Sequence, residues 1–155
     1  MFLHIEVPDE WTTTAVDDGH LHELGDTSIH ASCIRELPAS VDHWMQRAAL
    51  RGAPANTSWT ERSRAKVKTV DGWNASLLEI ALDHPSFARV RVVAFYRFLD
   101  YGAGAVLDVH ASWYDAQRDD LVALLATARP DWGAQDLACL ANLCGGAHRR
   151  LLTLK

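Results

Sequence analysis

The chain has 155 residues, of which 48% are hydrophobic and 23% charged, a composition that fits a folded globular protein and excludes disordered and fibrous classes. Residues 1–155 are expected to form a single domain, because this length suffices for one buried core. The net charge of −5 argues against a nucleic-acid partner, whose phosphates require a basic surface, and favours another protein.

The N-terminal segment predicts a strand. Residues 2–7 alternate in the period-2 pattern of a half-buried strand, which Pro8 ends. The segment lacks the basic start and continuous apolar run of a signal peptide. Nowhere do about eighteen apolar residues follow one another, as a membrane helix would require. We therefore expect a cytoplasmic protein without a membrane span.

The next part of the chain predicts a strand and a helix. Residues 12–26 are polar, with room for a short strand near 20–24, and residues 27–36 alternate as a firmer strand. Ser40 is a good N-cap for a helix that ends near residue 51. Its apolar stripe consists of Val41, Trp44, Met45, Ala48 and Ala49.

A block of strands follows a predicted loop at residues 53–60. Expected strands cover 64–70, 73–82, 88–99 and 103–112, and Asp71-Gly72 is a strong hairpin signal between the first two. Four consecutive strands joined by short turns predict an antiparallel meander.

The C-terminal part predicts helices. A second helix opens at Tyr114 or Asp115 and stops at Pro130, with Leu121, Leu124, Leu125 and Ala128 as its buried stripe. A third helix at 134–143 and a basic, then apolar, tail at 147–155 follow. The fold class is thus α+β: an antiparallel sheet of about six strands flanked by helices, with a core at 1–132 and an added C-terminal helix and tail at 133–155.

The histidines and cysteines offer weak candidates for chemistry. His20, His22, His30 and His110 suggest a metal site without the spacing that zinc motifs have. Asp108, His110 and Ser112 have the composition of a catalytic triad, but no nucleophile motif accompanies them. Cys33, Cys139 and Cys144 are interpreted as buried thiols. We expect no catalytic residue, no metal and no cofactor, and a hydrolytic or metal-dependent enzyme remains the alternative.

A basic sheet face is the strongest feature of the predicted surface. Alternation places six cations on one face of the meander: Arg64, Lys66, Lys68, Arg89, Arg91 and Arg97. They would bind an acidic partner. Alternatively, they form a solvated face that pairs with Glu79 and Asp108.

Aromatic and acidic side chains complete the candidate partner-binding set. Trp59 in a polar loop and Trp73 after a hairpin turn would be interface anchors if they are exposed, although a core position is the competing interpretation for each. Trp11, Trp44 and Trp113 are expected in the core. Asp17, Asp18 and Glu23 would supply charge complementarity.

The order of elements resembles the PsbP-like fold, which is shared by photosystem II extrinsic proteins, a Ran-binding nuclear import factor and the Eag-type chaperones of bacterial type VI secretion. The resemblance covers residues 1–132. It rests on Ile5-Glu-Val-Pro-Asp-Glu-Trp11, the helix at 40–51, Val70-Asp-Gly-Trp73 and the helix at 113–128.

This resemblance implies a non-enzymatic module that binds another protein. Small acidic bacterial proteins of this kind look like immunity proteins, or adaptors and chaperones, of secreted effectors. The long segment 12–26 and the extension 133–155 depart from the Eag-type pattern, which leaves toxin neutralisation open. A structural subunit that oligomerises through its tail is a further alternative.

Overall fold

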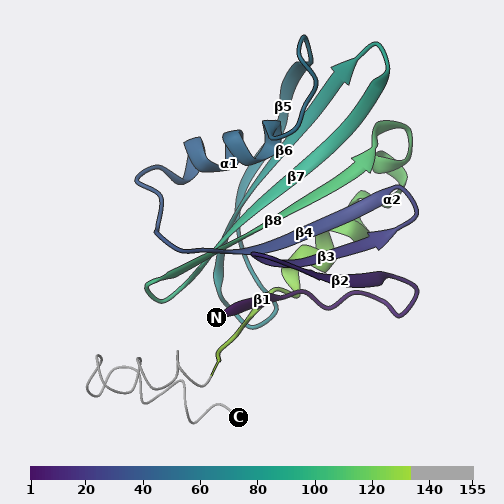
Figure 1. The fold of residues 1–155 in the computed structure, drawn as a ribbon. Helices are drawn as coiled ribbons and strands as arrows, with labels where there is room; N and C mark the ends of the chain where they lie inside the picture. The colour runs from purple at the N-terminus through teal and green to yellow at the C-terminus, as the bar shows by residue number, and fades with distance from the viewer. Residues whose placement is uncertain (134–155) are drawn as a thin grey trace.

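The computed structural model describes residues 1–133. The elements are β1 (Phe2–His4), β2 (Thr12–Val16), β3 (Gly19–Leu24), β4 (Thr27–Ile34), α1 (Val41–Leu50), β5 (Ser58–Lys68), β6 (Asn74–His84), β7 (Phe87–Phe98), β8 (Tyr101–His110), α2 (Ala111–Ala126) and β9 (Arg129–Asp131). Seven strands form one antiparallel sheet in the order β2-β3-β4-β8-β7-β6-β5, and β1 pairs separately with β9 (Figure 1). The α+β class is confirmed, with seven strands in the large sheet where about six were expected. In this part of the chain, no helix has the length and apolar character to cross a membrane.

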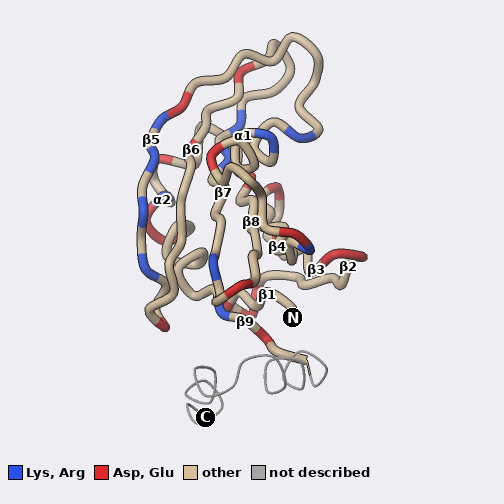
Figure 2. Tube along the Cα trace, turned by 90° about the vertical axis from the view of Figure 1, so that its left-hand side faces the viewer, with Lys and Arg blue, Asp and Glu red and all other residues tan. Residues whose placement is uncertain are grey.

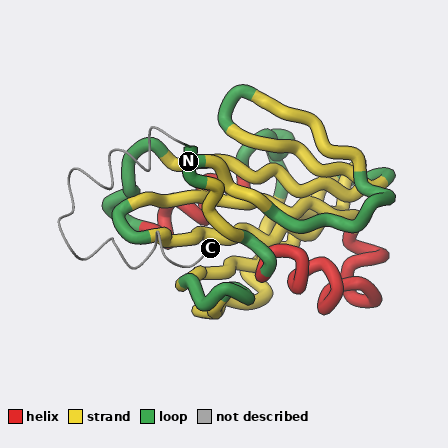
Figure 3. Tube along the Cα trace, turned by 90° about the horizontal axis from the view of Figure 1, so that it is seen from below, coloured by secondary structure: helices red, strands yellow, loops and turns green. Residues whose placement is uncertain are grey.

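The two helices lie on opposite faces of the large sheet, which we call the α1 face and the α2 face. Along β7, for example, Val92 belongs to the core cluster that includes residues of α2, and Val93 to the cluster that includes residues of α1. This alternation follows from the period-2 geometry of strands. Figure 3 shows α2 lying along one side of the twisted sheet.

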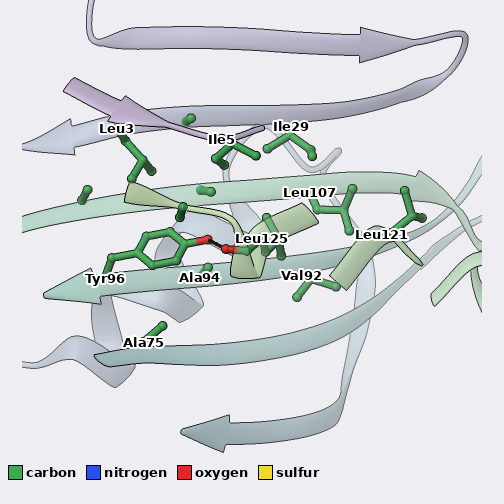
Figure 4. Close-up of a cluster of buried hydrophobic side chains, with 14 of the residues drawn as sticks. Leu3, Ile5, Ile29, Ala75, Val92, Ala94, Tyr96, Leu107, Leu121 and Leu125 are labelled. Atoms are coloured by element: carbon green, nitrogen blue, oxygen red, sulfur yellow. Dashed lines mark hydrogen bonds between the residues drawn. The ribbon is translucent and has the colours of Figure 1, made fainter. Parts of the chain in front are cut away.

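The larger core lies on the α2 face. It packs Leu3 of β1, strand residues such as Ile29 and Leu107, and the α2 residues Leu121 and Leu125 (Figure 4). Tyr96 is fully buried there, and its hydroxyl donates a 2.8 Å hydrogen bond to the Leu125 carbonyl. Burial raises the pKa of this phenol well above its usual value. The bond ties the last turn of α2 to the middle of the sheet.

The smaller core lies under α1. Met45, Ala48 and Ala49 are buried against β6 and β7, as the stripe predicted, and Ser40 caps the helix by accepting a hydrogen bond from the His43 N–H. Trp44 covers β8 at Gly104, where a β-carbon would come within 2.2 Å of the indole. Glycine at this position therefore lets α1 approach the sheet closely.

The N-terminal strand differs from the prediction. β1 covers only Phe2–His4 and lies outside the large sheet, where it pairs with β9 at the other end of the described chain. Leu3 and Ile5 are buried, and Trp11 is 8% exposed, so its predicted core position is confirmed. The start of the chain serves as a cover for the α2 face.

Both edges of the large sheet extend further than predicted. The polar segment 12–26 forms the hairpin β2–β3, although only a short strand near 20–24 was expected, and β5 begins at Ser58 inside the predicted loop 53–60. The four-strand meander β5–β8 is confirmed.

Several side chains lie elsewhere than predicted. Trp113 is 60% exposed on α2, so its expected core position is wrong. The helix opens earlier than expected, at Ala111, because His110 acts as its N-cap. Cys33 is half-buried, and its thiol donates to the Met1 carbonyl. Cys139, Cys144, the third helix and the tail lie outside the described residues.

His22 makes the fold sensitive to acid. It is 5% exposed, its Nδ1 lies 2.8 Å from the Thr13 hydroxyl, and its Nε2 has no hydrogen-bond partner among residues 1–133. Burial, followed by the charges of His20 and His4, lowers the pKa of His22. The unfolded chain therefore binds more protons, and stability is lost as the pH falls below about 6.5 towards the lowered folded value.

We expect denaturant unfolding to show a smaller free energy at pH 5 than at pH 7.5, and a weaker dependence on pH in the His22→Gln variant. Because all other histidines are the same in both proteins, the comparison isolates the buried imidazole of His22. The same pH dependence in both proteins would contradict the role given to His22.

Candidate partner-binding surface

β5 is the outer strand of the sheet, and its side chains bury almost nothing. It pairs with β6 from Ser58 to Lys68, yet of its residues only Val67 is half-buried and all others are exposed. Backbone hydrogen bonds to β6 and side-chain ion pairs therefore keep this strand in the sheet. A long exposed edge presents unpaired backbone groups on which another chain can pair. β5 is the candidate surface for a partner.

The six predicted cations lie on the α1 face. Arg64, Lys66 and Lys68 of β5 pair across β6 with residues that in turn pair with Val93, Phe95 and Arg97 of β7. Arg89 and Arg91 alternate with these β7 residues on the same face. Figure 2 shows the cations following one another along β5. The structure thus brings the basic residues to one side of the sheet.

Three of these cations form ion pairs with carboxylates. Arg64 pairs with Asp42 of α1 at 2.5 Å and with Glu61 at 3.0 Å. Arg89 and Arg91 share Asp108 at 2.5 and 2.6 Å. The alternative of a paired, solvated face holds for these three. Glu79, the other carboxylate that this alternative expected, lies on the α2 face and pairs with Arg62 and Arg118 instead.

Arg91 fastens α1 to the sheet. Its Nη1 donates to the carbonyl of Ala49 at 2.8 Å and to that of Arg51 at 2.7 Å, which are among the last carbonyls of the helix. A cation at a helix C-terminus also interacts favourably with the helix dipole. Arg91 is therefore a structural residue of the fold.

Lys66, Lys68 and Arg97, which we call the cationic rim, remain available. Within residues 1–133 none of them pairs with a carboxylate, and Arg97 donates only to the nearby Leu99 carbonyl at 3.2 Å. Lys66 and Arg97 line a depression of 430 Å³ in front of the start of α1. On a chain of net charge −5, three cations that have no carboxylate partner in the described part of the chain make a candidate site for an acidic group.

An apolar slot opens on the other side of the same stretch of β5. It has a volume of 260 Å³ and separates β5 and β6 from α2. Its lining is dominated by apolar side chains: Val67, Ala75, Leu77, Tyr96, Val122, Ala123, Leu125 and Ala126, with Lys68, Thr69 and Asp119 completing it. α2 packs over β7 and β8, and this leaves the sheet beneath β5 incompletely covered.

A cluster of ion pairs lies beside the slot, nearer the N-terminal end of β5. The Glu79 side chain is 5% exposed, and its carboxylate forms ion pairs with Arg62 at 3.3 Å and Arg118 at 3.1 Å. The register of β5 shifts between Glu61 and Ser63, and this bulge directs Arg62 towards α2, where it also pairs with Asp115 at 2.7 Å. The alternation of β5 gave no signal for this role, because a bulge breaks the period.

The remaining predicted residues lie in three separate regions. Trp59 is 42% exposed on β5, on the same face as the cationic rim. Trp73 is half-buried and packs edge-on against Phe98 at 5.3 Å, so it contributes to the core. Asp17, Asp18 and Glu23 lie in and after the β2–β3 turn, at the opposite edge of the sheet.

A polar cleft of 360 Å³ lies beside α1 on that opposite half. Asp18 holds His30 at 3.0 Å, and Ser28 and Ser32 line the same cleft, but neither hydroxyl hydrogen-bonds to the imidazole within the described residues. Such an Asp–His pair orients an imidazole without activating a nucleophile.

The histidines and the triad-like residues do not converge. His20 and His22 stack on the α2 face, whereas His30 lies on the α1 face. His110 caps α2, and Asp108 is bound by two arginines. Among residues 1–133, no three His, Cys, Asp or Glu side chains are placed to hold a metal ion.

The comparisons with known proteins identify the fold. The structure is similar to cyanobacterial PsbP from Synechocystis sp. PCC 6803, with a TM-score of 0.65 and 9% sequence identity over 83% of this chain and 86% of that one. It is also similar, at a TM-score of 0.46 and 12% identity, to PA94 from Pseudomonas aeruginosa, a protein of unknown function, over 80% and 99% of the two chains. No protein-family model and no curated protein sequence matches. The chain has a PsbP-like fold, and at these identities the similarity concerns the fold alone.

Proposed function

We propose that this chain is a non-enzymatic, cytoplasmic protein-binding module whose partner engages β5 and the cationic rim. The observation that carries the proposal is that β5, eleven residues long, leaves all its side chains exposed except Val67, and that neither Lys66 nor Lys68 forms an ion pair within residues 1–133. An edge of this kind is a liability for a protein that stays alone. A partner that covers it would satisfy both its backbone and its charge.

A small acidic module of this kind would act as an immunity protein, or as an adaptor or chaperone, for a secreted bacterial effector. Binding would act by steric occlusion or sequestration. Trp59, exposed on the same strand, would serve as an aromatic anchor beside the charges. The acidic partner surface would meet the cationic rim.

We expect this protein to form a complex with the product of the neighbouring reading frame in size-exclusion chromatography. The double variant Lys66→Glu/Lys68→Glu should weaken the complex about tenfold or more, because two attractive charge pairs become repulsive. Both lysines are exposed, so folding should be retained.

The matched control is Arg35→Glu/Arg47→Glu, which changes the net charge equally at two exposed positions away from β5. It should bind almost as the wild type does. Equal weakening in both variants would show general electrostatics and contradict the assigned surface. Absence of any complex would count against the proposed role.

A further inference from the structure

The lower segment of β5, residues 63–68, combines an open edge with two different chemistries on its two faces. On the α1 face are Arg64, Lys66 and Lys68; on the α2 face are Ser63, Ala65 and Val67. All but Val67 are exposed. Every second residue of an edge strand points its N–H and C=O groups away from the sheet. This segment can therefore accept a further strand.

The length available is limited by the bulge at Arg62. Above it the register shifts, and Arg62 turns towards Glu79 and Asp115. Below it the pairing with β6 is regular from Ser63 to Lys68. Six residues of strand extend about 20 Å. A partner segment of about six residues would fit.

The two faces specify what such a strand would carry. A side chain beside Val67 on the α2 face would lie next to the apolar slot of 260 Å³. A side chain beside Lys66 or Lys68 on the α1 face would meet the cationic rim. Because successive side chains of a strand point to opposite faces, apolar and acidic residues must alternate in the partner.

We infer that residues 63–68 of β5 bind an extended segment of a partner protein as an eighth strand, in which apolar residues facing the slot alternate with acidic residues facing the cationic rim. The inference rests on the proposed function and adds how the partner is recognised. Main-chain hydrogen bonds provide the affinity, and the alternating side chains provide the specificity.

A second copy of the chain does not fit this description. Its own β5 would place Arg64, Lys66 and Lys68 against like charges, which destabilises cross-strand pairs. Its other edge, β2, reads Thr-Thr-Thr-Ala-Val from Thr12 to Val16 and carries no acid. The occupant is therefore a different protein.

The test uses labelled peptides of about eight residues and fluorescence anisotropy on the full chain. One peptide alternates glutamate with valine and leucine; the control has the same composition in two blocks. We expect the alternating peptide to bind about tenfold tighter, and this preference to disappear in Lys66→Glu/Lys68→Glu but not in Arg35→Glu/Arg47→Glu.

Backbone methylation separates strand addition from side-chain attraction. In two versions of the alternating peptide, the amides of either the odd or the even residues are N-methylated, which removes the donors on one edge. One version should lose binding and the other keep it. Retention by both, or equal binding of the block peptide, would overturn the inference. Failure of every peptide while the neighbouring gene product still binds would overturn it too, and would leave the proposed function standing.

Discussion

Gly19→Ala is expected to cost about 3 kcal/mol or more of unfolding free energy, a large share of the stability of a domain. Gly19 opens β3 opposite Ser32 of β4. A β-carbon there would lie 1.9 Å from the backbone oxygen of Ala31. Because the obstacle is backbone of the adjacent strand, β3 would have to separate from β4. Urea unfolding followed by circular dichroism measures the loss.

The matched control is Gly25→Ala at the next turn. Gly25 has a positive φ of 57°, but nothing lies within 4 Å of its β-carbon position. Its replacement should cost about 1 kcal/mol through backbone strain alone. Equal losses in the two variants would contradict the close approach of β3 to β4.

Asp108→Ala is expected to destabilise the protein by about 3–5 kcal/mol. The Asp108 side chain is 17% exposed and neutralises Arg89 and Arg91, each 12% exposed. Removing it leaves two poorly solvated guanidinium groups, although Arg89 keeps Asp26 at 2.6 Å. Because Arg91 also binds the C-terminal carbonyls of α1, the attachment of this helix should loosen.

Asp83→Ala provides the comparison for Asp108. Asp83 is exposed on β6, and its replacement should change stability by no more than about 0.5 kcal/mol. Asp108→Asn should lie between the two, because it keeps acceptor capacity and loses the charge. A change in Asp108→Ala as small as that in Asp83→Ala would contradict the structural role of the shared carboxylate.

Periodicity predicted those parts of the fold that bury one face. Strands β6, β7 and β8 and the stripe of α1 show clear periods, because their apolar residues face a core. The two edge strands do not: β2 is exposed throughout, and β5 buries only part of Val67. Without a buried face little alternation of polarity results, so no strand was predicted at residues 12–16, and the predicted loop 53–60 overlaps the start of β5 at Ser58.

The candidate surface was predictable only in part. Alternation correctly placed Lys66 and Lys68 on one face with Arg97. The ion pair of Arg64 with Asp42 depends on where α1 lies, and the apolar slot depends on how far α2 reaches over the sheet. Such tertiary distances leave no pattern in a single sequence. The glycines illustrate the same limit, because Gly19 and Gly25 look alike in sequence and serve different purposes.

Amide hydrogen exchange on the complex with the neighbouring gene product tests most directly that β5 is the partner-binding edge. In the free protein, the outward amides of residues 63–68 should exchange fast, and in the complex they should be strongly slowed. Residues 12–16 of β2, the other edge, serve as the internal control and should not change. Protection confined to β2 or to the cleft beside α1, with residues 63–68 unchanged, would contradict the account.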